Sequence, residues 1–254
     1  MKIVWRFCFV LTGLGLLTAC QAPSPESSAY VAASGSARAE AAEDRPGLAT
    51  AWGETIDSPV STTGFQRASK RPTAVAKIFY NDRSGIEQLT KNQAQRQRSS
   101  TISLGNLGHV RIETPGGRAY PIWRWRNDYY VEGKKGDRYV IEAENRSAAP
   151  LEIVASVDGL DVLDGKTATY SKRGYQIDPG DTVRIKGFRR STGAVAAFRF
   201  STVDDSYAQR KYGDSRNVGV IGVAAFHERG SDPDSRLRRN ADPFPGESGF
   251  ATAP

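Results

Sequence analysis

The densest group of side chains able to bind a ligand is Trp123-Arg124-Trp125-Arg126, followed by Tyr129-Tyr130. Successive side chains of a β-strand point to opposite faces, so the tryptophans would share one face and the arginines the other. Flat indole rings stack on sugar rings, and guanidinium groups bind phosphate or carboxylate. The alternative, which we favour, places the tryptophans in a core and the arginines in solvent. These four residues are still the best candidate for a ligand surface in the sequence.

Acidic residues and histidines offer weaker signals. Asp158, Asp161 and Asp164 recur every three residues, as carboxylates around calcium could. Two of them precede glycine, which already explains them as turn residues, and their order does not match an EF-hand loop. Neither His109 nor His227 has the spacing of a zinc site or a nucleophile elbow. We therefore expect no metal, no cofactor and no catalytic residue.

The N-terminus carries a different kind of chemistry. Lys2 and Arg6 precede an apolar run over residues 7–17, and Leu17-Thr18-Ala19-Cys20 follows at its end. That run is too short to span a membrane but has the length of a signal-peptide core. The segment resembles the bacterial lipobox. The resemblance implies cleavage before Cys20, a diacylglyceryl thioether on its sulfur and a third acyl chain on its amine, such as palmitate. Several acyl chains anchor a protein stably, whereas one binds a membrane only marginally.

The same segment predicts where the protein resides. Residues 1–19 would be removed as a signal peptide. Gln21, rather than aspartate, follows the cysteine, which by analogy with lipoproteins favours the outer membrane, on its periplasmic face. Because Cys8 leaves with the signal peptide and Cys20 is acylated, we expect no disulfide, although the compartment would permit one.

Charge narrows the choice of partners. The chain has 35 Lys and Arg against 28 Asp and Glu, a net charge of +7, and loss of Lys2 and Arg6 lowers this to +5. The charges are interspersed, as on a solvated surface. The alternative is attraction to anionic envelope components such as phospholipid, lipopolysaccharide or wall polymer. We expect no nucleic-acid partner, because the protein is exported and carries no nucleic-acid motif.

Composition divides the chain into segments. Residues 20–48 are rich in Ala, Ser, Pro and Glu and have few large apolar side chains, which predicts a disordered tether behind the lipidated cysteine. Residues 229–254 predict a flexible tail for the same reason. Residues 49–228 have the size of one domain.

Within that domain the hydrophobic period is two, which indicates strands. The alternating runs lie at 139–144, 151–157, 182–186 and 196–200, and the run at 218–226 is apolar on both faces, as in a central strand. Short strands with turns between them predict an all-β fold with one or two short helices. We expect an antiparallel β-sandwich, immunoglobulin-like or jelly-roll-like.

Turn chemistry adds local predictions. Gly133 to Asp137 should close a hairpin between residues 129–131 and 138–144, and Asp158-Gly159 should form a tight turn. Asp178-Pro179-Gly180-Asp181 fits a type II turn. Helices are expected at about 84–97 and 204–212, the second capped by Asp204.

Several of these segments resemble a family of bacterial envelope proteins that has no assigned activity. The resemblance rests on residues 158–166, 172–175, 179–180, 185–189, 195–201 and 217–223, and on Ala51-Trp-Gly-Glu54 with Ile78-Phe-Tyr-Asn-Asp82. It implies that residues 51–82 belong to the fold. It brings no catalytic or binding residues.

Three functional hypotheses follow. The leading one is a lipid-anchored, non-enzymatic interaction or scaffolding module that faces the periplasm and binds an envelope protein or polymer. The second is a glycan- or anionic-polymer-binding module that uses Trp123 to Arg126. The third is an envelope hydrolase whose carboxylates pair only in three dimensions.

Overall fold

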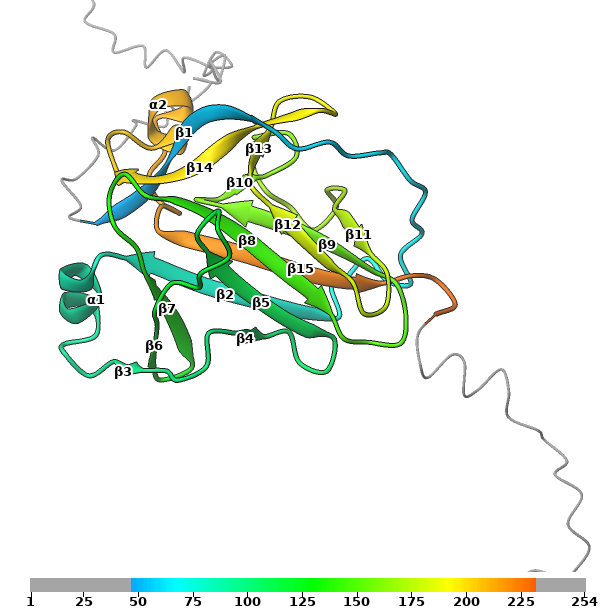
Figure 1. Ribbon diagram of the computed structural model, residues 1–254, viewed down its shortest axis with the longest axis horizontal. Helices are drawn as coiled ribbons and strands as arrows, with labels where there is room; N and C mark the ends of the chain where they lie inside the picture. Colours follow the sequence, from blue (N-terminus) through cyan, green and yellow to red (C-terminus); the bar gives the residue numbers. More distant parts are fainter. Residues whose placement is uncertain (1–46, 232–254) are drawn as a thin grey trace, which may run out of the picture. The chain divides into compact units, whose positions relative to one another are not determined.

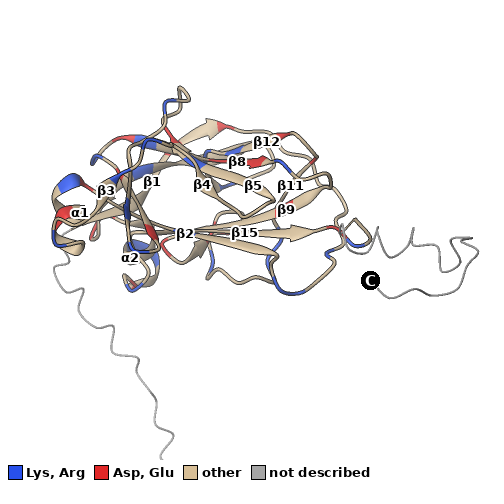
Figure 2. Cartoon of the chain, turned by 90° about the horizontal axis from the view of Figure 1, so that it is seen from below, with Lys and Arg blue, Asp and Glu red and all other residues tan. Residues whose placement is uncertain are grey.

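The computed structural model describes residues 47–231, and its strands run from Leu48 to His227. These strands form two sheets packed face to face, which Figure 2 shows edge-on. The predicted all-β sandwich is therefore confirmed. No helix within the described residues is long and apolar enough to cross a membrane. Cys20, the signal peptide, most of the tether and most of the tail lie outside the described residues.

The first sheet has seven strands, in the order β1-β14-β8-β5-β4, with β12 beside β8 and β13 beside β14. Figure 1 shows β8, β5 and β12 running side by side. The bounds are β1 Leu48–Asp57, β4 Ile102–Ser103, β5 Gly108–Glu113, β8 Arg138–Asn145, β12 Thr182–Ile185, β13 Gly187–Arg189 and β14 Ala194–Thr202.

The second sheet has eight strands, in the order β10-β9-β15-β2-β7-β6-β3, with β11 beside β9. The β2–β7 pair is parallel, and all other pairs between the described strands are antiparallel. The bounds are β2 Ala74–Asn81, β3 Gln95–Arg96, β6 Ile122–Trp125, β7 Asp128–Glu132, β9 Leu151–Val157, β10 Leu160–Asp161, β11 Tyr175–Ile177 and β15 Val220–His227.

The core lies between the sheets and follows the alternation read from the sequence. Inward residues such as Ile141, Ile153 and Phe198 are at most 1% exposed. β15 lies between β9 and β2, so the prediction of a central strand over 218–226 is confirmed. Its Gly222 permits close packing, since a Cβ atom there would lie 2.7 Å from the Ser156 hydroxyl.

A buried polar chain crosses this core. The Tyr80 hydroxyl donates to Asp158 Oδ1 at 2.6 Å, and Thr50 Oγ1 lies 2.7 Å from both the Tyr80 and the Tyr139 hydroxyls. Because each hydroxyl has one proton, Tyr139 must donate to Thr50 and Thr50 to Tyr80. The backbone N–H groups of Thr50 and Gly219 complete the carboxylate's partners at 2.8 and 2.9 Å. These hydrogen bonds join β1 and β8 of one sheet to β2 and the turn after β9 of the other.

Two predicted turns are confirmed. Asp158 and Gly159 have φ angles of 53° and 79°, which form a two-residue turn of the primed type between β9 and β10. Gly180 has φ of 82° and the Asp181 N–H donates to the Asp178 carbonyl at 3.0 Å, as a type II turn requires.

The hairpin predicted around Gly133 to Asp137 is wrong. β7 pairs with β2 and β6, whereas β8 pairs with β5, β12 and β14 in the other sheet. The segment is a crossover: the Gly133 N–H donates to the Asn81 carbonyl and the Gly136 N–H to the Phe200 carbonyl. Its turn residues bind both sheets rather than two neighbouring strands.

Both helices are shorter than expected. α1 covers Arg83–Leu89, where Asp82 caps its start, and the chain then turns into β3. α2 covers Tyr207–Tyr212. Its cap is Ser206, whose hydroxyl accepts from the Gln209 N–H at 3.1 Å, and not Asp204 as predicted.

Candidate functional site

The Trp123–Arg126 segment lies at the β6–β7 hairpin, near α1 and β3 (Figure 1). Both tryptophans are partly buried, and both arginines are exposed. The arginines do not share a face as expected. β6 ends at Trp125, and Arg126 enters the turn with a φ of 55°, which folds its guanidinium over the Trp125 ring at 4.4 Å.

Other side chains of the domain already contact both indole rings. The Arg83 guanidinium lies 3.9 Å from the Trp123 ring centroid, and the Trp123 N–H donates to Glu132 Oε2 at 2.8 Å. The Trp125 N–H donates to Gln93 Oε1 at 3.3 Å. A sugar ring that stacked on either indole through its covered face would have to displace an arginine.

The sequence-predicted acidic and histidine residues are dispersed. Asp158 is in the core chain, whereas Asp161 accepts from the N–H groups of Leu163 and Asp164 and so shapes its own turn. His109 is half-buried on β5, and His227 is 8% exposed at the end of β15. Within the described residues, no three His, Cys, Asp or Glu side chains gather as they would around a metal ion.

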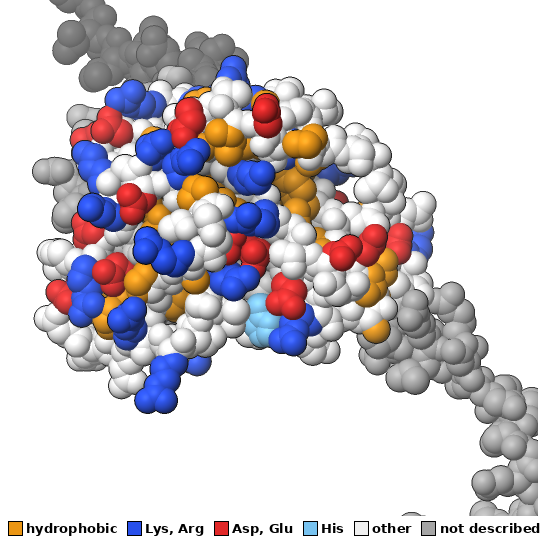
Figure 3. Space-filling view, in the orientation of Figure 1, with side chains coloured by type: hydrophobic (Ala, Val, Ile, Leu, Met, Phe, Trp, Pro, Cys, Tyr) orange, Lys and Arg blue, Asp and Glu red, His pale blue; other side chains and the backbone are white. Residues whose placement is uncertain are grey.

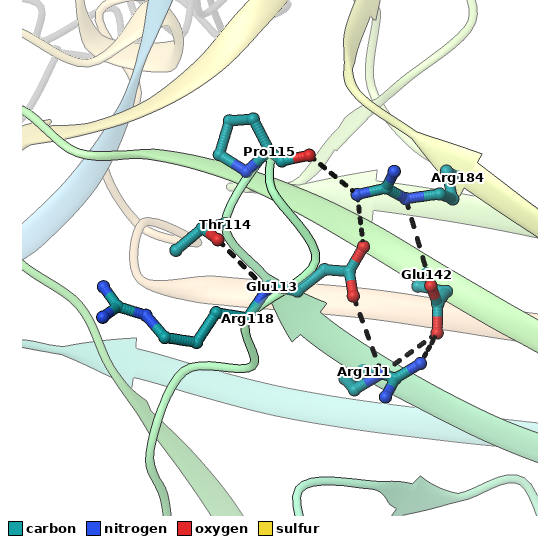
Figure 4. Close-up of polar contacts among 7 residues, drawn as sticks. All are labelled: Arg111, Glu113, Thr114, Pro115, Arg118, Glu142 and Arg184. Carbon is teal, nitrogen blue, oxygen red and sulfur yellow. Dashed lines mark hydrogen bonds and ion pairs between the residues drawn. The ribbon is translucent and has the colours of Figure 1, made fainter.

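A charged cluster covers the outer face of the first sheet. Figure 4 shows Arg111, Glu113, Glu142 and Arg184 pointing toward one another from β5, β8 and β12. Glu113 Oε1 lies 2.5 Å from Arg184 Nη2, and Arg111 Nε lies 3.0 Å from Glu142 Oε1. The Glu142 carboxylate raises the pKa of the Arg111 guanidinium through this hydrogen bond.

The positive and negative charges of the cluster balance each other, since each carboxylate contacts both arginines. Figure 3 shows that acidic and basic side chains are interspersed over this face. We assign the cluster a structural role, because it ties three strands together across their outer surface.

A groove on the described part of the chain has a volume of about 820 Å³. One wall is residues 58–67, which we call the strap, since this segment carries the chain from β1 toward β2 (Figure 1). The opposite wall is residues 171–176, with Leu163, Val183 and Arg189 between them. We call this site the strap groove.

Both ends of the strap are fixed. At the first, the Ser58 N–H donates to the Gly193 carbonyl at 2.8 Å, and Arg189 Nη1 donates to the Ser58 carbonyl at 2.7 Å. At the second, Arg67 Nε donates to Glu152 Oε2 at 2.5 Å, and the Arg67 guanidinium also binds the carbonyls of Tyr170 and Lys172. Arg67 thus joins the two walls, so the groove is formed before a ligand arrives.

The lining is positively charged and rich in hydroxyls. Its cations are Arg67, Lys172, Arg173 and Arg189, against the single carboxylate Glu152. Serine, threonine and tyrosine hydroxyls add donors and acceptors along the same walls; they belong to Ser61, Thr62, Thr63, Ser171, Tyr175 and Thr192.

Not all of these cations are equally engaged. Arg67 pairs with Glu152, and Lys172 pairs with Asp164 at 2.5 Å. Arg173 is exposed and makes no ion pair with a described residue. Neither histidine lines the groove. The arrangement can hold an anionic or polar partner, and it presents no evident acid–base pair.

Sequence reasoning missed the strap groove. Its walls come from segments more than a hundred residues apart, and the lining residues are individually ordinary loop residues. The local sequence signal for this cationic site was the pair of consecutive basic residues Lys172 and Arg173.

No family model matches the sequence, and no curated protein or solved structure is significantly similar to it. The resemblance to envelope proteins and to the lipobox therefore stays a prediction.

Proposed function

We propose that this protein is a lipid-anchored, non-enzymatic binding module of the bacterial envelope, which faces the periplasm and holds its partner in the strap groove. The observation that carries the proposal is the groove itself. Its walls are fixed at both ends by hydrogen bonds, and its lining is cationic and hydroxyl-rich. Such a surface recognises a partner through charge and hydrogen bonds.

An envelope protein is the leading partner. The polymer alternative is favoured by Lys172 and Arg173, which stand beside a row of hydroxyls and would suit a polyhydroxylated anionic chain. The lipid at Cys20 would restrict the module to a membrane surface, and residues 20–48 would set its reach.

Crosslinking in intact envelopes of the host tests the proposal. The tagged full-length protein would be compared with Cys20→Ala and with two charge reversals at exposed arginines. Arg173→Glu lies in the groove, and Arg118→Glu lies on the β5–β6 connection as its matched control. Material recovered with the protein would be identified by mass spectrometry.

We expect one dominant partner, lost in Arg173→Glu and retained in Arg118→Glu. Cys20→Ala should leave the membrane fraction and lose the partner as well. Recovery of wall or lipopolysaccharide fragments in place of a protein would select the polymer alternative. Equal recovery by both charge reversals would contradict the assignment of the groove.

A further inference from the structure

A second cleft lies between β1 and α2, which contact each other (Figure 1). It has a volume of about 560 Å³, within the range of about 300–1,000 Å³ usual for small-ligand sites. We call it the aromatic cleft. It shares no residue with the strap groove, and its main side chains are Trp52, Lys135, Arg199, Tyr207, Arg210 and Lys211.

Trp52 is 40% exposed and lies on β1, the edge strand of the first sheet. Its ring is parallel to that of the buried Phe188, with 6.0 Å between centroids, and lies 4.6 Å from the ring of Tyr207. Tyr207 in turn packs 4.9 Å from Phe188. The indole is therefore held rigidly by a buried ring while part of its surface faces the cleft.

The backbone aims this side chain. Trp52 stands directly opposite the buried Phe198 in the register between β1 and β14, so its side chain lies on the inner face of the sheet, and the register shifts only beyond it, before Thr55. Gly53 is needed there, since a Cβ atom would lie 2.5 Å from the Ala197 carbonyl oxygen. The indole therefore lies at the rim of the core, where it stacks on Phe188 and also lines the cleft.

The cations of the cleft fall into two groups. Arg199 binds Glu54 Oε2 at 2.7 Å, and Arg210 binds Asp205 Oδ1 at 2.6 Å. Lys135 and Lys211 are exposed and form no ion pair with any described residue. Asp205 is the one carboxylate of the lining and pairs with Arg210, and Glu54 pairs with Arg199, so among the described residues the cations of the cleft outnumber the carboxylates that contact them.

Lys211 links the charge to the aromatic surface. Its ammonium donates to the Tyr207 hydroxyl at 2.5 Å and lies 4.9 and 5.2 Å from the ring centroids of Tyr207 and Tyr212. Tyr212 is itself 46% exposed. A ligand that touched Trp52 with a flat apolar face would thus meet an ammonium group beside it.

We propose that the aromatic cleft binds an anionic saccharide. The C–H face of a sugar ring would stack on Trp52, and a carboxylate or phosphate of the sugar would bind Lys135 and Lys211. A plain inorganic anion would leave the indole unused, and a neutral sugar would leave the lysines unused. In an envelope, such a saccharide could come from the wall polymer or from the phosphorylated core of a glycolipid.

Calorimetric titration of the full-length protein in detergent tests this proposal with three probes. Tetragalacturonic acid has rings and carboxylates, maltotetraose has rings without charge, and tetrapolyphosphate has charge without rings. The variants are Trp52→Ala and the double change Lys135→Gln with Lys211→Gln. Trp125→Ala is the matched control, because it removes another partly exposed indole outside the cleft.

We expect measurable binding of tetragalacturonic acid alone, weakened at least tenfold by Trp52→Ala and by the double lysine change, and unaltered by Trp125→Ala. The lysines are exposed, so the double variant keeps the test valid should Trp52→Ala fail to fold. Absence of tetragalacturonic acid binding would overturn the proposal. The proposal would also be overturned if tetrapolyphosphate bound as tightly as tetragalacturonic acid and Trp52→Ala did not weaken that binding. It would likewise be overturned if maltotetraose bound as tightly as tetragalacturonic acid, or if Trp125→Ala abolished the binding of tetragalacturonic acid.

Competition identifies the source. Displacement of tetragalacturonic acid by purified muropeptides would assign the wall, and displacement by lipopolysaccharide core oligosaccharide would assign the glycolipid. Displacement by neither would contradict an envelope saccharide as the ligand. Binding of an anionic saccharide in the aromatic cleft depends on neither the strap groove nor lipid at Cys20, whereas an envelope source for that saccharide rests on the proposed function.

Discussion

The carboxylate of Asp158 is fully buried between the two sheets, where burial raises its pKa from 3.8 to about 6. Its hydrogen bonds from Tyr80, Thr50 and Gly219 oppose this rise but do not cancel it. The charged form is therefore held at a cost. That cost is tolerated because the same carboxylate terminates the hydrogen-bond chain through Tyr80, Thr50 and Tyr139.

This predicts a pH dependence of the free energy of unfolding. Between pH 3.8 and about 6 the folded protein holds the Asp158 proton more tightly than the unfolded chain does, so stability falls as pH rises through that window and levels above it. The side chain of Asp158→Asn cannot ionise, so the variant lacks this pH dependence. From pH 4 to pH 7 the free energy of unfolding of the wild type should therefore fall relative to that of the variant, by roughly 3 kcal/mol at most, in urea titrations.

Tyr80→Phe is the companion variant. It keeps the carboxylate but removes a hydrogen bond that lowers its pKa. The fall in stability with pH should then persist, become larger and extend to higher pH, because the folded pKa rises while the unfolded pKa stays the same. Parallel pH profiles for wild type and Asp158→Asn would show that the buried carboxylate does not titrate in this range.

At the scale of elements, the Arg67–Glu152 pair decides where the strap lies. Glu152 is 6% exposed, and its other oxygen accepts the Gly174 N–H at 2.7 Å, so one carboxylate binds both walls of the strap groove. The Arg67 guanidinium also stacks 3.8 Å from the Phe226 ring centroid.

Arg67→Met should destabilise the domain by about 3–5 kcal/mol, because it leaves a buried carboxylate without its cation. Hydrogen exchange of residues 58–73 should accelerate with it. Replacing both partners, Arg67→Met with Glu152→Met, should restore part of the stability, and Lys70→Met at an exposed position of the same connection should do nothing. A double variant worse than the single one would contradict the pairing argument.

The β13–β14 hairpin depends on a different feature, the absence of a side chain at Gly187. A Cβ atom there would lie 1.9 Å from the Ala196 carbonyl oxygen of β14. Gly187→Ala should therefore lower the free energy of unfolding by about 1–3 kcal/mol. Gly193→Ala in the same hairpin, where a Cβ atom meets nothing within 4 Å, should be close to neutral in the same thermal and urea measurements.

At the scale of the whole molecule, the sandwich was predictable because burial alternates along its strands. The alternating runs near Ile141, Ile153 and Phe198 show which face of each strand packs in the core, and this holds for any order of the strands in the sheet. The order was not predictable by the same argument. The turn residues from Gly133 to Asp137 suit a hairpin and a crossover equally well, and tertiary contacts with Asn81 and Phe200 decide between them.

The sites were harder to predict than the fold. The Trp123–Arg126 segment stood out by composition, yet in the structure the guanidinium groups of Arg83 and Arg126 lie over its indole rings. Trp52 did not stand out, because one tryptophan in a strand looks like a core residue. Its exposure follows from the place of β1 at the edge of the first sheet, which no local sequence pattern specifies.

The most direct test of the binding-module account uses a photoreactive benzoylphenylalanine at Thr62, in the exposed middle of the strap, in envelopes of the host. The same group at Arg118 is the control. The account predicts one discrete adduct from position 62 that disappears when Arg173→Glu is added, and no such adduct from position 118. Identical adducts from both positions, or an adduct at position 62 that Arg173→Glu leaves unchanged, would contradict it.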